Sequence, residues 1–285
     1  MQTLKELIDL LNLEQIEVNI FRGQNYETPW KRVFGGQVLA QSIHAAYQTV
    51  PLERTIHSLH GYFILTGDIN HPIVYNVDVL RDGGSFSTRR VVAIQHGKAI
   101  FNMAASFQLN QQGYDHQIEM PDVIGPEESI SEEKIAEKFI KSAPEMYRRF
   151  TRSRPIEFRR ADNLDVLEKS ASPPFQHVWF KAKGDLPLDS RMNHEILAYA
   201  TDYNLLGTAL LPHKDQFEFQ DIFLASLDHG MWFHRDFRID QWLLFAIDSP
   251  SASNSRGFTR GNIFTQSGLL VASVVQEGLI RKINK

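Results

Sequence analysis

The feature that most constrains the fold of this chain is an internal repeat. A His-Gly pair followed closely by aromatic residues occurs at His60 and again at His229, 169 residues later (229 − 60). The run that ends at Gln108 matches the run that ends at Gln276, at an offset of 168 residues (276 − 108). Two matches at nearly one offset indicate a tandem duplication, so we expect two copies of one structural module. The copies differ most at their polar positions, which favours the second copy as the place to look for chemistry.

The composition and charge limit the class of protein. The chain has 285 residues, of which 42% are hydrophobic and 22% charged, as in ordinary globular proteins with room for two domains. Its net charge of −4 argues against a general nucleic-acid binder, which would carry a basic excess. The lack of cysteine excludes disulfides, thiolate metal ligands and a cysteine nucleophile, and it fits a reducing cytosol.

The N-terminal segment has the pattern of an amphipathic helix rather than of a signal peptide. Leu4, Leu7, Ile8 and Leu11 have helical spacing, and charged residues lie between them. No apolar run of the sequence approaches the ~18 residues that a membrane-spanning helix needs. We therefore expect a cytoplasmic protein that binds neither membranes nor nucleic acid.

Each half of the sequence combines one apolar helix with several strand-like segments. The helices are expected to start at Gly35-Gly36 and at about Met192. The expected strands are 57–65, 73–81, 86–95 and 99–109 in the first half, and 156–160, 177–182, 222–234, 241–249, 257–265 and 269–281 in the second. Short turns join many of them, so the strands are antiparallel. A central helix wrapped by a long antiparallel sheet, occurring twice, is the pattern of a double hotdog, an α+β fold.

The predicted domain organisation follows the repeat. Residues 1–110 are expected to form the N-terminal hotdog module, and residues 155–285 the C-terminal module that carries most catalytic residues. Residues 111–154 form a polar connector with a helix expected from Glu132 to Phe139.

Asp202 is the first of five polar candidates in the second half, the others being Ser226, Asp228, His229 and Gln276. Asp202 borders the apolar stripe of its predicted helix, where lost solvation would raise the pKa of the carboxyl group and suit a general base. The structural alternative is that Asp202 only caps its helix or bonds the following turn. Gln276 lies on an otherwise apolar strand face and needs partners, because an unpaired buried amide costs about 1–3 kcal/mol.

Two other kinds of site are weaker predictions. Ser226 lies in a strand-like run and no G-x-S-x-G motif occurs, so a triad of Ser226, His229 and an aspartate lacks its usual geometry. His229 would otherwise bond the backbone or pack beneath Trp232. Neither His57 with His60 nor His229 with His234 has a third ligand at informative spacing, and no H-E-x-x-H occurs. We expect no metal and no cofactor.

Several longer blocks make the chain similar to the acyl-CoA thioesterase II family along essentially its whole length. The blocks are FRG at 21–23, RVFGGQ at 32–37, LRDG at 80–83, FSTRRV at 86–91, DH at 228–229, MWFHR at 231–235, RGF at 256–258, VAS at 271–273 and VQEG at 275–278. The resemblance implies double-hotdog enzymes that hydrolyse acyl-CoA to free fatty acid and coenzyme A. It also implies an assembly of chains into a homodimer or homotetramer.

The resemblance further implies which residues act. An aspartate, a hydroxyl residue and a glutamine orient the attacking water in that family, and the matching positions here are Asp202, Ser226 and Gln276. The family commonly has threonine at the hydroxyl position, so Ser226 is a departure that keeps the oxygen and loses a methyl group.

Substrate-binding residues are a weaker part of the prediction. Backbone N–H groups at Gly35 and Gly36, at a helix start, are candidates to stabilise the thioester oxyanion. Arg256 and Arg260 are candidates to bind the phosphates of coenzyme A, or else are surface arginines of a hairpin.

Two alternative functions stay open at this point. One is a hotdog hydratase or dehydratase that acts on acyl thioesters with His229 as its base. The other is a non-catalytic acyl-CoA-binding module in which Asp202 and Gln276 are structural.

Overall fold

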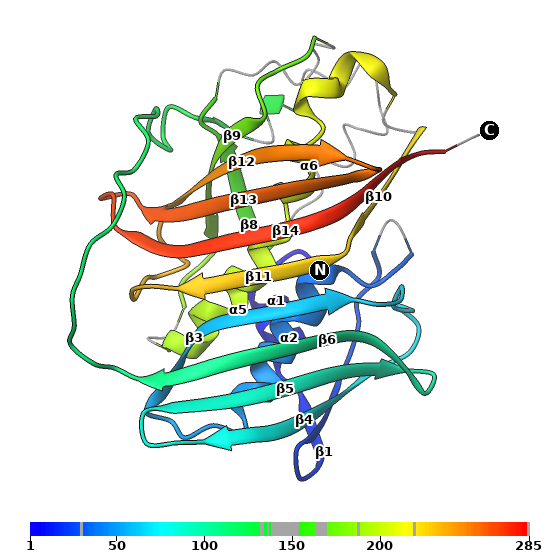
Figure 1. Cartoon of the computed structure of the whole chain (residues 1–285), viewed down its shortest axis with the longest axis vertical. Helices are drawn as coiled ribbons and strands as arrows, with labels where there is room; N and C mark the ends of the chain where they lie inside the picture. Colours follow the sequence, from blue (N-terminus) through cyan, green and yellow to red (C-terminus); the bar gives the residue numbers. More distant parts are fainter. Residues whose placement is uncertain are drawn as a thin grey trace.

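A computed structural model describes residues 1–28, 31–131, 134–135, 137, 154–162, 170–186, 189–218 and 221–283. Its main feature is a large antiparallel sheet, which has 14 strands in the part of the chain described. Figure 1 shows the strands of both halves as one continuous sheet, with the central helices α2 (Gly35–Tyr47) and α5 (Ser190–Thr201) behind it. The structure confirms the predicted α+β double hotdog.

The first module agrees closely with the sequence prediction. Its helix α2 is buried on almost every side, as a helix at the centre of a hotdog must be. The N-terminal helix α1 (Leu4–Leu11) forms as predicted, and Thr3 and Glu6 make a capping box at its start. The strands are β1 (Glu14–Glu17), β2 (Ile20–Gly23), β3 (Arg54–Phe63), β4 (Ile73–Asp82), β5 (Phe86–Gln95) and β6 (Lys98–Leu109). The short strands β1 and β2 were not predicted from the sequence.

The second module repeats this arrangement around α5. Its strands are β7 (Ile130–Ser131), β8 (Ile156–Arg160), β9 (Phe175–Ala182), β10 (Ile222–Ser226), β11 (Asp228–Phe233), β12 (Leu243–Ser253), β13 (Arg256–Thr265) and β14 (Leu270–Lys282). The short helix α6 (Leu205–Thr208) and the 3-10 helix η1 (Leu211–Gln216) follow α5 and were not predicted. Most of the helix expected at 132–139 lies outside the described residues.

The two modules meet where β3 pairs with β11. The repeated His-Gly motifs lie directly opposite each other there, with His60 paired to Gly230 and Gly61 to His229. Gly61 is required by a close approach, since a Cβ at this position would lie 2.5 Å from the ring of Phe101. The repeat therefore marks the seam of the continuous sheet.

Behind the sheet, α2 and α5 contact each other through polar side chains as well as apolar ones. The ring of His44 lies 3.1 Å from a carboxylate oxygen of Glu195, and the Tyr47 hydroxyl lies 2.9 Å from His194 Nδ1.

No helix in the described part of the chain is long and apolar enough to cross a membrane.

Candidate active site

Three predicted side chains converge between α5 and the sheet of the second module. Gln276 on β14 donates from Nε2 to Asp202 Oδ1 over 2.9 Å and to Ser226 Oγ over 3.0 Å. Ser226 Oγ lies 3.5 Å from the same carboxylate oxygen and donates to it. The structure thus brings together Asp202, Ser226 and Gln276, which are far apart in the sequence.

Asp202 is the residue on which this cluster is centred. It follows the last residue of α5 as the C-cap, so the expectation that it lies at the helix end is confirmed. Its side chain does more than cap the helix, because Oδ2 accepts a hydrogen bond of 2.8 Å from the backbone N–H of Gly36 in the other module. The site is therefore built from both modules, with α5 of one facing the start of α2 of the other.

Burial and hydrogen bonding act in opposite directions on the Asp202 carboxyl group. Burial raises its pKa above the ordinary value, while the hydrogen bonds from Gln276, Gly36 and Ser226 lower it. Gly36 also belongs to the N-terminal turn of α2, where the helix dipole favours a negative charge. The result is a carboxylate that is held in a fixed orientation and is more basic than an exposed aspartate.

A shift in strand register places Ser226 on the same face of the sheet as His229. The sequence predicts one strand over 222–234, in which residues three apart would point to opposite faces. Instead, Ser226 of β10 pairs with Gly278 while Gly230 of β11 pairs with Val275, so the register shifts by one residue near Leu227. Such a shift is what a β-bulge produces. Both side chains therefore turn toward Gln276 and the helix layer.

His229 supports the cluster and is not equipped to act as its base. Its ring Nδ1 lies 3.3 Å from Gln276 Nε2, and its Nε2 lies 3.3 Å from Thr201 Oγ1. Thr201 donates its own proton to the backbone oxygen of Ala198, so the neutral His229 ring donates from Nε2 and turns the lone pair of Nδ1 toward the Gln276 amide, whose two hydrogens are shared among Asp202, Ser226 and His229. Complete burial lowers the pKa of His229 to about 3. These contacts leave neither ring nitrogen for Ser226, which argues against the triad and against a histidine-based hydratase.

Gln276 is held almost completely inside the protein, with 1% of its surface exposed. Its Nε2 faces Asp202, Ser226 and His229, whereas its Oε1 has no hydrogen-bond partner among the described residues. A buried acceptor without a partner costs about 1–3 kcal/mol. This arrangement fixes the amide with its donor group toward the carboxylate, and it is poorly explained by a purely structural role.

The predicted glycines lie at the site, but their roles differ from the expectation. The N–H of Gly36 is bonded to Asp202, so Gly36 is not the free oxyanion donor that was predicted. Gly35 lies beside the same carboxylate, and a Cβ there would be 2.8 Å from Asp202 Oδ2 and 3.0 Å from the ring of Phe63. No local sequence pattern indicates that Gly36 binds Asp202, because that contact joins the two modules.

The two predicted arginines are not brought to the cluster. Arg256 pairs with Glu277 over 2.7 Å and Arg260 with Asp248 over 2.9 Å. Side chains alternate along β13, and Thr259, the partner of Gln276 across the strands, is buried while Arg260 is exposed. Both arginines therefore lie on the sheet face opposite to Gln276, as expected of surface arginines in a hairpin.

The chain is similar to known proteins over its whole length. A family model described as acyl-CoA thioesterase matches residues 147–279, and one described as acyl-CoA thioesterase N-terminal domain matches residues 26–108. Acyl-CoA thioesterase 2 of Haemophilus influenzae is 42% identical over 98% of this chain and 98% of its own length. Acyl-coenzyme A thioesterase 8 of Homo sapiens is 40% identical over 95% of this chain and 88% of its own. The crystal structure of an acyl-CoA thioesterase II from Mycobacterium marinum matches with a TM-score of 0.81 and 43% identity, over 97% of this chain and 98% of that one.

Proposed function

The chain belongs to the acyl-CoA thioesterase II family and is a thioester hydrolase, and we propose that Asp202 activates the hydrolytic water while Ser226 and Gln276 orient it. The observation that carries this proposal is the convergence of two polar side chains, Ser226 and Gln276, on Oδ1 of the buried Asp202 carboxylate, while the Gly36 N–H at the start of α2 holds Oδ2. Acyl-CoA is the substrate, and coenzyme A and a free fatty acid are the products.

The proposed reaction begins with a water held at the Asp202 carboxylate. Each carboxylate oxygen has two lone pairs. Oδ1 accepts from Gln276 and Ser226, whereas Oδ2 accepts from Gly36 alone, so Oδ2 keeps acceptor capacity for the water. Asp202 takes a proton as the water oxygen attacks the thioester carbonyl carbon. The tetrahedral intermediate then breaks its carbon–sulfur bond, and the proton held by Asp202 passes to the departing thiolate. The balance is one water consumed, one carboxylic acid formed and one thiol released.

The groups around Asp202 contribute mainly by positioning. Ser226 and Gln276 hold the carboxylate and the water in one geometry, which converts a random encounter into an oriented one. The backbone N–H of Gly35, at the first residue of α2, is the donor that we propose for the oxyanion, because the first N–H groups of a helix have no acceptor within it.

The proposal is tested first by measuring thiol release from acyl-CoAs of graded chain length with a thiol reagent. Steady release with at least one of these substrates supports hydrolysis. Binding of acyl-CoA without release of thiol would instead support the non-catalytic module.

Replacing Gln276 should move the pH profile in a direction that follows from its hydrogen bonds. Gln276 lowers the pKa of Asp202 by donating to its ionised form, so Gln276→Met should raise that pKa. Asp202 acts only when deprotonated, so the fall of kcat/KM on the acidic side should begin at a higher pH in the variant. The control is Gln108→Met, the residue that matches Gln276 in the sequence repeat but is partly exposed on β6, and it should leave the profile unchanged. An acidic limb that stays in place in Gln276→Met would contradict the assigned contact.

Ser226→Thr should retain most of the activity. Threonine keeps the oxygen that accepts from Gln276 Nε2 and donates to Asp202, and it adds only the methyl group that restricts the rotamer. We expect kcat within roughly threefold of the parent, whereas Ser226→Ala, which removes the oxygen, should lower kcat by about tenfold, as lost orientation of one group would. Equal kcat values for the Ala variant and the parent would remove Ser226 from the mechanism.

A further inference from the structure

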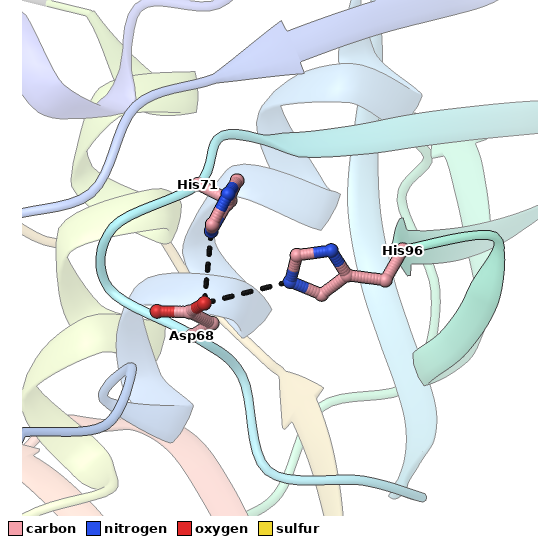
Figure 2. A group of neighbouring side chains, drawn as sticks. All are labelled: Asp68, His71 and His96. Atoms are coloured by element: carbon pink, nitrogen blue, oxygen red, sulfur yellow. Dashed lines mark hydrogen bonds and ion pairs between the residues drawn. The ribbon is translucent and has the colours of Figure 1, made fainter.

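We propose that Asp68, His71 and His96 form a binding site for one divalent transition-metal ion of the zinc class, separate from the catalytic site. The three side chains come from two neighbouring connections of the first module, the loop between β3 and β4 and the turn between β5 and β6. One ligand atom from each lies within 4.8 Å of the other two. Figure 2 shows both imidazole rings directed at the carboxylate of Asp68.

The two distances from Asp68 to the histidines are close to those that a metal ion requires. Asp68 Oδ2 lies 2.8 Å from His71 Nδ1 and 3.5 Å from His96 Nε2. Tetrahedral zinc with bonds of about 2.0–2.2 Å places neighbouring ligand atoms about 3.3 Å apart. Shifts of roughly half an ångström or less would therefore bring Asp68 Oδ2 to that distance from each histidine nitrogen. The two histidine nitrogens lie within 4.8 Å of each other, and rotation of these exposed side chains would close the remaining gap.

The backbone that carries two of the ligands is held rigidly by a buried amide. Gln95, which is 5% exposed, accepts from the N–H of Asp68 over 2.8 Å and donates from Nε2 to the backbone oxygens of Asp68 and His71 over 2.8 and 2.7 Å. Asn25 Nδ2 also donates to the backbone oxygen of Asp68, over 3.2 Å. Gln95 directly precedes His96, so the residue that fixes the loop of Asp68 and His71 is also the chain neighbour of the third ligand, His96. Such prior ordering reduces the entropy lost when a metal binds.

Two further local features aim the ligands at a common point. Asn70 donates from its backbone and its side chain to Asp68 Oδ1, over 2.9 and 3.0 Å, which leaves Oδ2 for the histidines. His96 has a φ of 49°, a left-handed conformation that is uncommon for residues other than glycine. The turn thereby brings the His96 ring to within 4.5 Å of the His71 ring, measured between centroids.

The donor set selects the class of metal. Two imidazole nitrogens and one carboxylate oxygen suit zinc and its neighbours in the first transition row, whereas magnesium and calcium prefer oxygen ligands only. His71 and His96 are exposed, so the remaining coordination positions would be filled by solvent. No thiol is needed, consistent with a chain that has no cysteine.

The fold itself does not require these three residues. In the second module, the loop between β11 and β12 holds an ion pair of Arg238 with Asp240 instead of an Asp-His cluster. The turn between β13 and β14 carries Gln266 and Ser267 and has no imidazole. The same connections therefore form without metal ligands, so the hotdog fold does not depend on the cluster of Asp68, His71 and His96.

The full-length protein, freed of metal with a chelator and dialysed, would be titrated with zinc chloride by isothermal titration calorimetry near neutral pH. We expect one zinc ion per chain and no comparable binding of magnesium. His71→Gln and His96→Gln should each weaken zinc binding by about tenfold or more, as expected when one of three protein ligands is lost. The matched control is His116→Gln, an exposed histidine elsewhere, which should bind zinc like the parent.

Two measurements make the result decisive. Melting temperatures without metal should be the same for all four proteins, because the exchanged side chains are exposed, and added zinc should raise the melting temperature of the parent but not of His96→Gln. Unchanged zinc binding in both His71→Gln and His96→Gln, or no binding to the parent, would overturn the proposal and leave a hydrogen-bonded Asp-His cluster. Thiol release is not used as a readout, so this test fails or succeeds independently of the catalytic proposal.

Discussion

Asp202→Asn is expected to lower kcat by ~10²–10⁴-fold, the range typical for loss of a general base, while the protein folds normally. Asparagine keeps the size of the side chain and an oxygen that can still accept from the Gly36 N–H, so packing between α2 and α5 should persist. It cannot accept a proton from water. The loss should therefore appear in kcat for thiol release at saturating acyl-CoA, with the melting temperature unchanged.

Asp228→Asn is the matched control for this variant. Asp228 also has a raised pKa, chiefly from burial, but its Oδ1 accepts a hydrogen bond of 2.6 Å from the backbone N–H of Glu277 within the sheet. Its contact is local, so kcat should fall by no more than about tenfold, far less than loss of the base costs. An Asp202→Asn protein that keeps near-parental kcat would show that the aspartate-water mechanism is wrong.

Gly35→Ala is expected to lower kcat by about 10²-fold, the effect of displacing reacting groups by roughly an ångström. The added methyl group would lie 2.8 Å from Asp202 Oδ2 and 3.0 Å from the ring of Phe63, so the carboxylate or the start of α2 must move. Such a shift would also break the alignment of Asp202 with the adjacent Gly36 N–H. The measurement is kcat for thiol release together with thermal unfolding.

Gly207→Ala provides the control for a glycine-to-alanine change. Gly207 lies in the short helix α6 with no atom within 4 Å of an added Cβ, so this change should leave kcat unaltered. Retention of parental kcat in Gly35→Ala would mean that the space beside the Asp202 carboxylate is not needed for the reaction.

The regular elements of this fold could be predicted from the sequence because each carries its own pattern. The apolar positions of α1 and the turn-forming residues 81–84 are local signals, and the structure confirms α1 and the hairpin of β4 and β5. The short strand β1 could not be found this way, since all four of its residues are exposed and it has no alternation of apolar residues. Its partner β2 follows it directly in the chain, and β2 in turn joins the sheet by pairing with the more distant β4.

The candidate site was predicted only as a set of residues, without its geometry. The register shift near Leu227 turns Ser226 and His229 to one face, and nothing in the residues themselves signals an irregularity within that strand. The bond from Gly36 to Asp202 joins segments 166 positions apart in the chain, so no local pattern contains it. The cluster of Asp68, His71 and His96 was missed for the same reason, because the folding of two connections, and not sequence spacing, brings its ligands together.

The most direct test of the aspartate-water mechanism is a single-turnover reaction in oxygen-18-labelled water, with enzyme in excess over acyl-CoA and rapid quenching into a mass spectrometer. Direct attack by water predicts that coenzyme A and fatty acid appear with the same rate constant. It also predicts that the label enters only the fatty acid and that the protein mass never increases. A burst of coenzyme A ahead of the fatty acid, with an acyl group attached to Ser226 or Asp202, would contradict it.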